Sequence, residues 1–389
     1  MTVRLYGRSV GHGSLSVVTS GFREVLDGAG LLDGFVALDK SGGSEEDLPP
    51  AGATARDAVF TGNLNLINAM RVGAKHERHW VQVTPNSTHI PPKLLGAVLQ
   101  LPNVRILSAS AWGTTMIGGA LGEMGLRYIE DGNIWLTYLM PGTNKTIAQV
   151  HTAHHGVSGF APIPAELERT RLDYELGKFR VVHFSTTEGE RKGTLELLQA
   201  WYLLRKNSRI PDKSELLLVL DHHARAALMQ RLAYDEIEMP TGVQFLPRGD
   251  MDTAAMSRFI CQQHLVCTPS RGEGFGLLPL QARACGVPVA TTVTTGHSAG
   301  HCHGPGVIRI LQDHALFSID DGPDALAPRV EPREIADAIA IAHGAWNGLS
   351  HMAESFSESV AKKWSWGAQL APLVKQLRCL ELPAFEQPL

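Results

Sequence analysis

The chain has 389 residues, 44% of them hydrophobic, and carries 35 lysine and arginine residues against 39 aspartate and glutamate residues. This length fits two domains of about 150 to 200 residues better than a single core. The formal net charge of −4 excludes the broad basic surface of an indiscriminate polyanion binder. Because the chain contains no run of about 18 apolar residues, integral membrane contact is not expected.

The start of the chain, Met1–Tyr6, reads as a strand and lacks the charged and apolar regions of a secretory signal. We therefore expect a cytoplasmic protein. Its five cysteines show no metal-ligand spacing, and their odd number favours free thiols over a disulfide framework. They are Cys261, Cys267, Cys285, Cys302 and Cys379.

The first half of the chain alternates short apolar runs with segments of helical periodicity, which predicts βαβ units around a mainly parallel sheet. Strands are expected at 3–6, 58–60, 80–83 and 104–107, and helices at 14–29, 64–72, 92–100 and 114–123. A loop that contains Gly11 and Gly13 directly follows the first strand. Open α/β sheets bind ligands at such a place, although this glycine spacing alone is a weak signal.

A basic cluster lies before the third of these strands and consists of Arg71, Lys75, His76, Arg78 and His79. Two interpretations are open. The cluster is either the solvated end of a helix, which is the commoner case, or a surface that meets an anionic acceptor.

The second half repeats the alternation, which predicts a second doubly wound sheet after a linker within 162–178. Strands are expected at 180–184, 216–220, 243–246, 265–267 and 287–290. Helices are expected at 193–204, 225–232, 251–263, 280–284, 332–343 and 352–377, the last interrupted near 363–366.

The run from Pro269 to Ala290 is the most informative segment of the chain. It carries three glycines around one carboxylate, Glu273, between a predicted strand and a predicted helix. Glycines at such a junction let a ligand approach the backbone closely, and the free N–H groups that open the helix favour an anion, typically phosphate. The carboxylate adds an acceptor for hydroxyl groups. Phosphates and hydroxyls together suggest a nucleotide sugar.

This run resembles the signature of the family-4 retaining glycosyltransferases of GT-B fold, in which a second glutamate follows a Glu-Gly-Phe-Gly loop. Glu273 matches the first glutamate, whereas Gln281 stands at the second position. The resemblance implies that Glu273 contacts hydroxyls of the donor sugar and that Gln281 accepts from the ribose, more weakly than a carboxylate would. The amides implied to hold the diphosphate are those of Gly274, Phe275, Gly276, Leu277 and Leu278.

Arg191 and Lys192 precede a predicted helix, where a cation is well placed to neutralise a leaving diphosphate. The family uses such a lysine together with an arginine several residues earlier. Lys192 matches the lysine, but Thr186 stands at the arginine position. The resemblance thus implies that Lys192 stabilises the leaving group, with Arg191 as a substitute for the missing cation. The alternative is a capped helix with solvated charges.

Many family members present a histidine to the donor sugar after a strand of the first domain. The matching segment places Asn86 near that position and His89 three residues on, so both are candidate catalytic residues. A polar turn in which Asn86 caps the next helix is the competing interpretation. The loop with Gly11 and Gly13 is similar to the first loop of GT-B enzymes, which lies under donor and acceptor.

No metal and no cofactor are expected besides the donor, for which UDP is favoured over GDP. The closest approach to a metal site is a glycine-rich loop without an ordered ligand set. Its residues are His297, His301, Cys302 and His303. The resemblance implies instead that Thr294–Gly300 lies over the nucleotide or the sugar.

The resemblance implies an α/β protein of GT-B fold, with two Rossmann-like, doubly wound domains facing across a cleft. We expect an acceptor-side domain at 1–170, a nucleotide-sugar-binding domain at 171–355 and a C-terminal helix at 356–389 that crosses back to the first domain. The late pair Ser365-Trp366 before a final helix also resembles the family.

The function implied is a retaining, metal-independent hexosyl- or pentosyltransferase that moves a sugar from a nucleotide sugar to a hydroxyl acceptor, with a sugar or glycan favoured. A phage-type DNA glycosyltransferase that modifies a hydroxymethylated base is an alternative. In that case the protein would act in the cytoplasm of a phage-infected host cell, whereas the other interpretations place it in the cytoplasm of a bacterial cell. A catalytically lapsed nucleotide-sugar-binding protein is another alternative, motivated by Thr186 and Gln281. A lipid-linked acceptor is less favoured, because no cationic amphipathic helix is evident.

Overall fold

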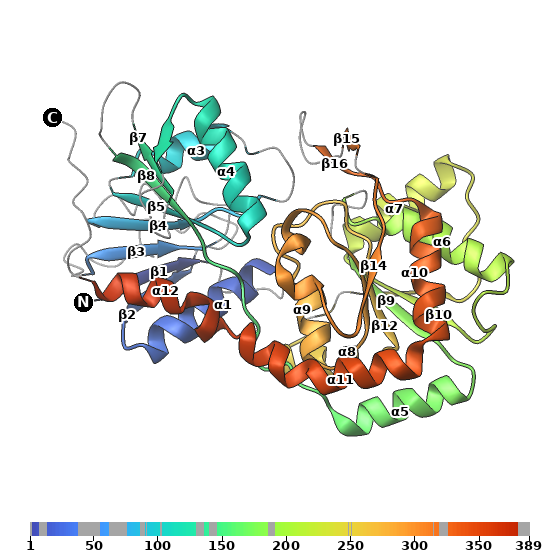
Figure 1. The fold of residues 1–389 in the computed structure, drawn as a ribbon. Coiled ribbons are helices and arrows are strands. Elements are labelled where there is room, and N and C mark those ends of the chain that lie inside the picture. The colour runs from blue at the N-terminus through green and yellow to red at the C-terminus, as the bar shows by residue number, and fades with distance from the viewer. Residues whose placement is uncertain are drawn as a thin grey trace. The chain divides into compact units, whose positions relative to one another are not determined.

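The structure is a computed structural model. It describes residues 2–7, 14–37, 55–61, 76–85, 90, 92–101, 103–129, 136–139, 146–185, 191–247, 249, 251–313, 315–318 and 326–379. The chain forms two compact α/β units (Figure 1), unit 1 from Met1–Gly156 with Ser365–Leu389, and unit 2 from Val157–Trp364. The expected fold class is confirmed. The expected domain limits at 170 and 355 differ from the limits of these units and stay predictions for independently folding domains.

Unit 1 is built on an eight-stranded sheet of order β2-β1-β3-β4-β5-β8-β7-β6. The first six strands in this order are parallel, and β7 and β6 extend the sheet in antiparallel fashion. The strands are β1 Val3–Gly7, β2 Leu32–Ala37, β3 Asp57–Phe60, β4 Arg78–Gln82, β5 Val104–Ser108, β6 Arg127–Ile129, β7 Leu136–Leu139 and β8 Thr146–Thr152. The four expected strands of this half are confirmed, and the sheet adds β2, β6, β7 and β8 to them.

The described helices of unit 1 are α1 Ser14–Gly28, α3 Pro92–Val98, α4 Ala111–Glu123 and α12 Trp366–Arg378. Ser365 begins α12, since its hydroxyl accepts from the amide of Ala368 at 3.2 Å. The helix packs on α1 (Figure 1), where the Trp366 ring lies 6.2 Å from that of Phe22. The expected helix at 64–72 lies outside the described residues, as do Arg71 and Lys75.

A buried ion pair joins the first residues of β3 and β4. Arg78, which is 4% exposed, donates to both carboxylate oxygens of the fully buried Asp57 at 2.5 Å each. Trp80 Nε1 donates to the same carboxylate at 3.1 Å. His79 is also fully buried in β4. Both interpretations of the basic cluster are therefore wrong for Arg78 and His79, because these side chains belong to the interior and not to a solvated surface.

Unit 2 is built on a six-stranded parallel sheet of order β11-β10-β9-β12-β13-β14. In chain order this is the 3-2-1-4-5-6 arrangement of a Rossmann sheet. The strands are β9 Arg180–Ser185, β10 Glu215–Leu220, β11 Val243–Pro247, β12 Leu265–Thr268, β13 Val289–Thr292 and β14 Val307–Ile310, with a separate hairpin of β15 Leu316–Ser318 and β16 Leu326–Pro328. The order reverses between β9 and β12, so the ligand site of such a sheet lies beyond the carboxyl ends of these two strands.

The helices of unit 2 are α5 Pro164–Glu175, α6 Thr194–Lys206, α7 His222–Tyr234, α8 Thr253–Cys261, α9 Leu277–Ala284, α10 Pro332–Gly344 and α11 Trp346–Lys363, with 3₁₀ turns η2 Thr295–Ser298 and η3 Gly300–Cys302. The segment expected as a linker, 162–178, is thus mostly helix α5. Apolar residues of α6, β10 and α10 form the main core, and α10 lies beside α6 (Figure 1).

The chain crosses between the units twice, and the two crossings are neighbours. The amide of Val157, where unit 2 begins, donates to the carbonyl of Trp364, where it ends, at 2.8 Å. Gly156 fits tightly against the other side of the second crossing, since a Cβ there would lie within 3.0 Å of the backbone of Ser365 and Trp366.

Within the described part of the chain, no helix combines the length and apolarity needed to cross a membrane. All five cysteines are free, as expected, and only Cys379 is exposed.

Candidate functional site

The loops after β9 and β12 meet at the point where the strand order of unit 2 reverses. The two strands are paired, with Val181 opposite Leu265 and Val182 opposite Val266. The glycine loop, defined here as residues 270–276, leaves the end of β12, and its Arg271 amide donates to the carbonyl of Arg191 at 2.8 Å. The sequence-predicted Arg191 and the sequence-predicted glycine loop are therefore brought together.

Two helices begin at this point, and each is preceded by a glycine with positive φ. Gly193 has φ +69° before α6, and Gly276 has φ +91° before α9. Neither helix start has a side-chain cap, whereas Asp221 and Asp252 cap α7 and α8 of the same unit at 2.7 Å. The first N–H groups of α6 and α9 are thus not satisfied by a capping side chain, which is the arrangement that suits an anion.

Glu273 is the centre of a charge cluster. Its Oε1 accepts from Lys192 Nζ and, at 2.9 Å, from the hydroxyl of Ser270. Its Oε2 lies 3.8 Å from Arg191 Nη1, and that nitrogen also donates to the carbonyl of Gly272 at 2.5 Å. The three charged side chains are 15%, 18% and 7% exposed for Glu273, Lys192 and Arg191. All three side chains are thus largely buried, and each keeps a small exposed fraction.

Within the described residues, the cluster carries an excess of positive charge, with two cations against one carboxylate. Burial opposes ionisation of Glu273, but the charges of Lys192 and Arg191 outweigh it and hold the pKa of the carboxyl far below its usual range. Two cations therefore face one permanent anion. Together with the starts of α6 and α9, this excess provides a place for a group with more than one negative charge.

The segment after β13 is fastened onto the glycine loop. Thr295 Oγ1 accepts from the Glu273 amide at 2.8 Å, and the Gly296 amide donates to the Glu273 carbonyl at 2.6 Å. His301 Nε2 donates to the Gly276 carbonyl at 3.0 Å. The ring of His301 stacks on that of Phe275 with centroids 4.1 Å apart. The backbone that carries Glu273 is consequently held from both sides.

His183 of β9 bonds both β12 and the start of α6, and the sequence gives no signal for its role. Its Nδ1 donates to the carbonyl of Cys267 at 3.0 Å, and its Nε2 accepts from the hydroxyl of Thr194 at 3.0 Å. Burial is the main reason that its pKa is lowered to about 4. Unit 2 contains two more histidines whose pKa burial lowers strongly, His264 to about 3 and His297 to about 4. These three are called the low-pKa histidines below.

The histidines that resembled a metal set have other partners. His297 and His301 both face Gly276 in the glycine loop, and His303 is exposed. Across the described residues, no three His, Cys, Asp or Glu side chains are grouped so as to hold a metal ion. The sequence pattern singled out this loop as the closest approach to a metal site, whereas in the structure His297 and His301 lie against the glycine loop.

The remaining sequence-predicted residues divide into two groups. Gln281 lies on α9 one turn after Leu277 and is 8% exposed, while Leu277 and Leu278 are half-buried at the start of that helix. Phe275 contributes its ring to the packing described above and is buried. The second group lies outside the described residues and consists of Gly11, Gly13, Asn86, His89 and Thr186.

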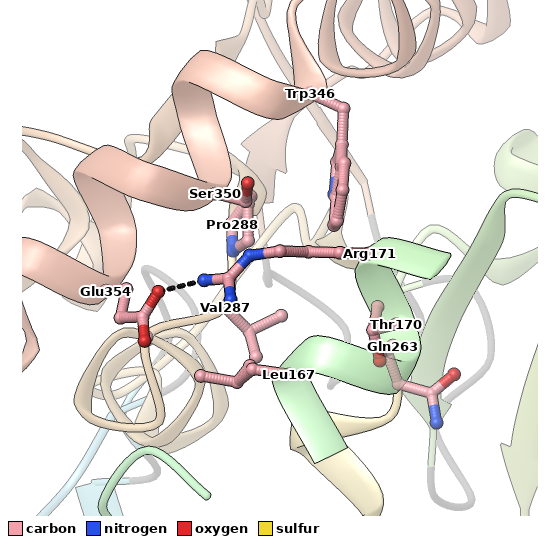
Figure 2. A pocket seen from close by; sticks show the side chains of 10 residues that line it. Leu167, Thr170, Arg171, Gln263, Val287, Pro288, Trp346, Ser350 and Glu354 are labelled. Carbon is pink, nitrogen blue, oxygen red and sulfur yellow. Dashed lines mark hydrogen bonds and ion pairs between the residues drawn. The ribbon is translucent and has the colours of Figure 1, made fainter. Parts of the chain in front are cut away.

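Two hollows lie away from the Glu273 cluster. The one in Figure 2 lies between α5, α11 and the start of β13, and Arg171 closes it through an ion pair with Glu354. It encloses only about 10 Å³, about the room for one water molecule. The other, of about 570 Å³, is an open groove between α1 and α12 in unit 1, lined mainly by small and apolar residues such as Gly28 and Ala371.

Sequence comparison finds related proteins through unit 2. Residues 178–340 match the model of a family described as Glycosyl transferases group 1. Over 120 residues the chain is 28% identical to the D-inositol 3-phosphate glycosyltransferase of Kribbella flavida, which covers 31% of this chain and 26% of that protein. The chain thus spans about a quarter of the length of the curated relative that it matches.

Solved structures resemble nearly the whole chain. Anabaena HepE in complex with UDP and glucose has a TM-score of 0.64 at 15% identity, covering 98% of this chain and 100% of that one. Sucrose-phosphate synthase of Thermosynechococcus elongatus has a TM-score of 0.64 at 14% identity, covering 97% and 98%. A trehalose-phosphate synthase of Burkholderia xenovorans in complex with glucose-6-phosphate has a TM-score of 0.65 at 10% identity, covering 97% and 100%. Residues 178–340 are thus similar to a glycosyltransferase group 1 domain, and the chain shares the GT-B fold of these solved structures.

Proposed function

We propose that the protein is a retaining glycosyltransferase that moves a sugar from a nucleoside diphosphate sugar, most simply a UDP-sugar, to a hydroxyl acceptor without a metal ion. One observation carries the proposal. Glu273, in the loop that leads into α9, is held by Lys192 and Arg191, which directly precede Gly193 and α6, and neither helix start has a side-chain cap within the described residues. The UDP bound in the HepE structure supports the choice of nucleotide.

The diphosphate would bind across the two helix starts. The amides of Gly274 to Leu278 would donate to its oxygens, and the excess positive charge of Lys192 and Arg191 would balance its charge. Lys192 has three N–H donors and gives one to Glu273. It would contact a phosphate oxygen through another of these donors while it keeps the carboxylate.

Glu273 would orient the donor sugar. Its Oε1 already accepts from Lys192 and Ser270, whereas the one partner of Oε2 within the described residues is the guanidinium of Arg191 at 3.8 Å. A sugar hydroxyl that donates to Oε2 would complete the carboxylate. Gln281 would accept from the ribose through its amide carbonyl, with Asn86 or His89 as further sugar contacts.

Departure of the nucleoside diphosphate would be the difficult step. Negative charge develops on the leaving phosphate, and donors positioned in advance stabilise it without reorganising. Lys192, Arg191 and the helix-start amides would supply this stabilisation. The acceptor hydroxyl would attack the face from which the diphosphate leaves, so that the anomeric configuration is retained.

A sugar or glycan acceptor fits best. Glucose and glucose-6-phosphate are bound in two of the similar structures. A DNA acceptor has less support, because Arg78 and His79, two residues of the basic cluster, are buried. The lapsed binding protein differs from an enzyme only in turnover, so the experiment below separates the two.

A panel of UDP-, GDP-, ADP- and dTDP-sugars tests the proposal by thermal shift and by slow hydrolysis of the donor. We expect at least one UDP-sugar to raise the unfolding temperature in proportion to the logarithm of its concentration over its Kd, and to be hydrolysed without added metal. Stabilisation without any hydrolysis or transfer would indicate the lapsed binding protein. Neither stabilisation nor hydrolysis with any member of the panel would refute the transferase.

A further inference from the structure

His297 is a buried polar side chain beside the glycine loop that the proposed mechanism leaves without a task. It lies in η2 and is 1% exposed. Its ring edge packs on Gly276, because a Cβ there would lie within 3.0 Å of both Cδ2 and Nε2. Nε2 has no hydrogen-bond partner among the residues that the structure describes. An unpartnered buried nitrogen is therefore directed at the uncapped start of α9.

The other ring nitrogen identifies the tautomer. Nδ1 of His297 lies 3.2 Å from Thr291 Oγ1 and 3.3 Å from Thr292 Oγ1. Both hydroxyls direct their own protons to carbonyls, Thr292 to that of Ser270 at 2.6 Å and Thr291 to that of Thr292 at 3.1 Å. Nδ1 is consequently the donor, and Nε2 of the neutral ring carries a lone pair.

Burial is the main reason that the ring of His297 is neutral, and the nearby charges modify its pKa further. Burial lowers its pKa to about 4; the Glu273 carboxylate opposes this effect, whereas Lys192 and Arg191 add to it. His301, the other histidine that faces the glycine loop, is committed to a backbone carbonyl through Nε2. A nucleoside diphosphate at the start of α9 would reverse the sign of the local charge.

We propose that His297 is a further donor-site residue: when a nucleoside diphosphate binds at the start of α9, Nε2 takes up a proton from solvent and donates to the diphosphate as the third cation of the site. This inference rests on the proposed function, because it needs a diphosphate at that helix. Two negative charges about 6 Å away, at an effective dielectric constant of about 20, raise the proton affinity of the ring by more than about a thousandfold. A ring with a pKa of about 4 then holds its proton at neutral pH.

Calorimetric titration of UDP into the full chain near neutral pH, in two buffers of different ionisation enthalpy, measures the protons taken up per UDP bound. His297→Gln keeps an amide near the position of Nε2 but cannot carry the charge. We expect this variant to take up about one proton fewer than the wild type and to bind UDP roughly tenfold more weakly or worse, as for one lost charged donor. His303→Gln makes the same change at an exposed histidine of the same segment, and it should keep the wild-type proton uptake.

Equal proton uptake by the wild type and His297→Gln, with UDP bound by both, would overturn the proposal. Should the variant not fold or not bind UDP, wild-type protein labelled with ¹⁵N in the histidine rings gives the answer. On addition of UDP one ring must change from the neutral to the imidazolium pattern, and no change refutes the role of His297. Failure of the wild type to bind UDP, GDP and ADP alike would instead refute the proposed function and this inference with it.

Discussion

Replacement of Gly276 by alanine should destabilise unit 2 through two separate effects. The residue has φ +91°, a region in which a residue with a Cβ is strained by about 1 to 2 kcal/mol. The new Cβ would also lie within 3.0 Å of the His297 ring, and such overpacking costs about 1 to 3 kcal/mol. The expected loss in the free energy of unfolding is therefore about 2 to 5 kcal/mol.

Thermal unfolding of the full chain, followed by tryptophan fluorescence and calorimetry, measures this loss. For a unit the size of 157–364, each kcal/mol lowers the midpoint by roughly 2 to 4 °C, so Gly276→Ala should lower it by about 4 to 20 °C. Gly348→Ala is the matched control, because Gly348 is exposed in α11 and a Cβ there would meet no atom within 4 Å. That change should stabilise the helix by about 0.5 to 1 kcal/mol.

A double-mutant cycle separates the clash from the backbone strain. In a His297→Ala background the ring is absent, and Gly276→Ala should cost only the strain of about 1 to 2 kcal/mol. The coupling energy between the two positions should then be about 1 to 3 kcal/mol. If the cost of Gly276→Ala is the same in both backgrounds, or falls below about 0.5 kcal/mol in the wild type, the contact between His297 and Gly276 does not exist as described.

Three further predictions follow from the charges. Lys192→Ala should lower turnover tenfold to a thousandfold in steady-state assays with the best donor, and unchanged kinetics would remove Lys192 from the mechanism. Arg78→Met should destabilise unit 1 by about 3 to 5 kcal/mol in urea unfolding, because it leaves the buried Asp57 unpaired. Arg56→Met, which breaks the exposed pair with Glu77, should lower the free energy of unfolding by less than about 1 kcal/mol. Equal losses for the two variants would contradict the burial of the Arg78–Asp57 pair. The low-pKa histidines stay neutral in the folded chain but bind protons in the unfolded chain near pH 6.5. Stability should therefore be complete above that pH and fall by up to about 4 kcal/mol per pH unit towards pH 4, so a flat urea midpoint between pH 7 and pH 5 would refute this.

The donor side of the fold could be predicted because its signals are local. Alternating apolar runs fix the positions of strands such as Arg180–Ser185 and Leu265–Thr268, and the glycines mark the loop between strand and helix. Helix α5 was not predicted, because its sequence lacks the apolar pattern of a helix that packs on a core. It buries only Leu167 and Thr170 within the segment Pro164–Glu175, too few residues to produce an apolar stripe in a mostly polar sequence.

Non-local pairing explains the other failures. Arg78 reads as a solvated cation because it lies in a short run of charged and polar residues, and the one acidic neighbour, Glu77, pairs with Arg56 at the surface. Its partner Asp57 becomes its neighbour only through the register of β3 and β4. Likewise, His297 and His301 are noticeable in the sequence, but only the folding of Thr295–Cys302 onto the glycine loop shows what they face. Roles that depend on two distant segments are invisible to local patterns.

The two neighbouring crossings of the chain have a consequence for folding during synthesis. Unit 1 is completed by α12, which leaves the ribosome only after all of 157–364 has been made. At about 5 to 20 residues per second, the face of α1 that carries Phe22 waits roughly 17 to 70 s for Trp366. Once unit 2 has folded, the hydrogen bond between Val157 and Trp364 holds the two crossings side by side. The docking of α12 on α1 then no longer costs the entropy of closing a long loop.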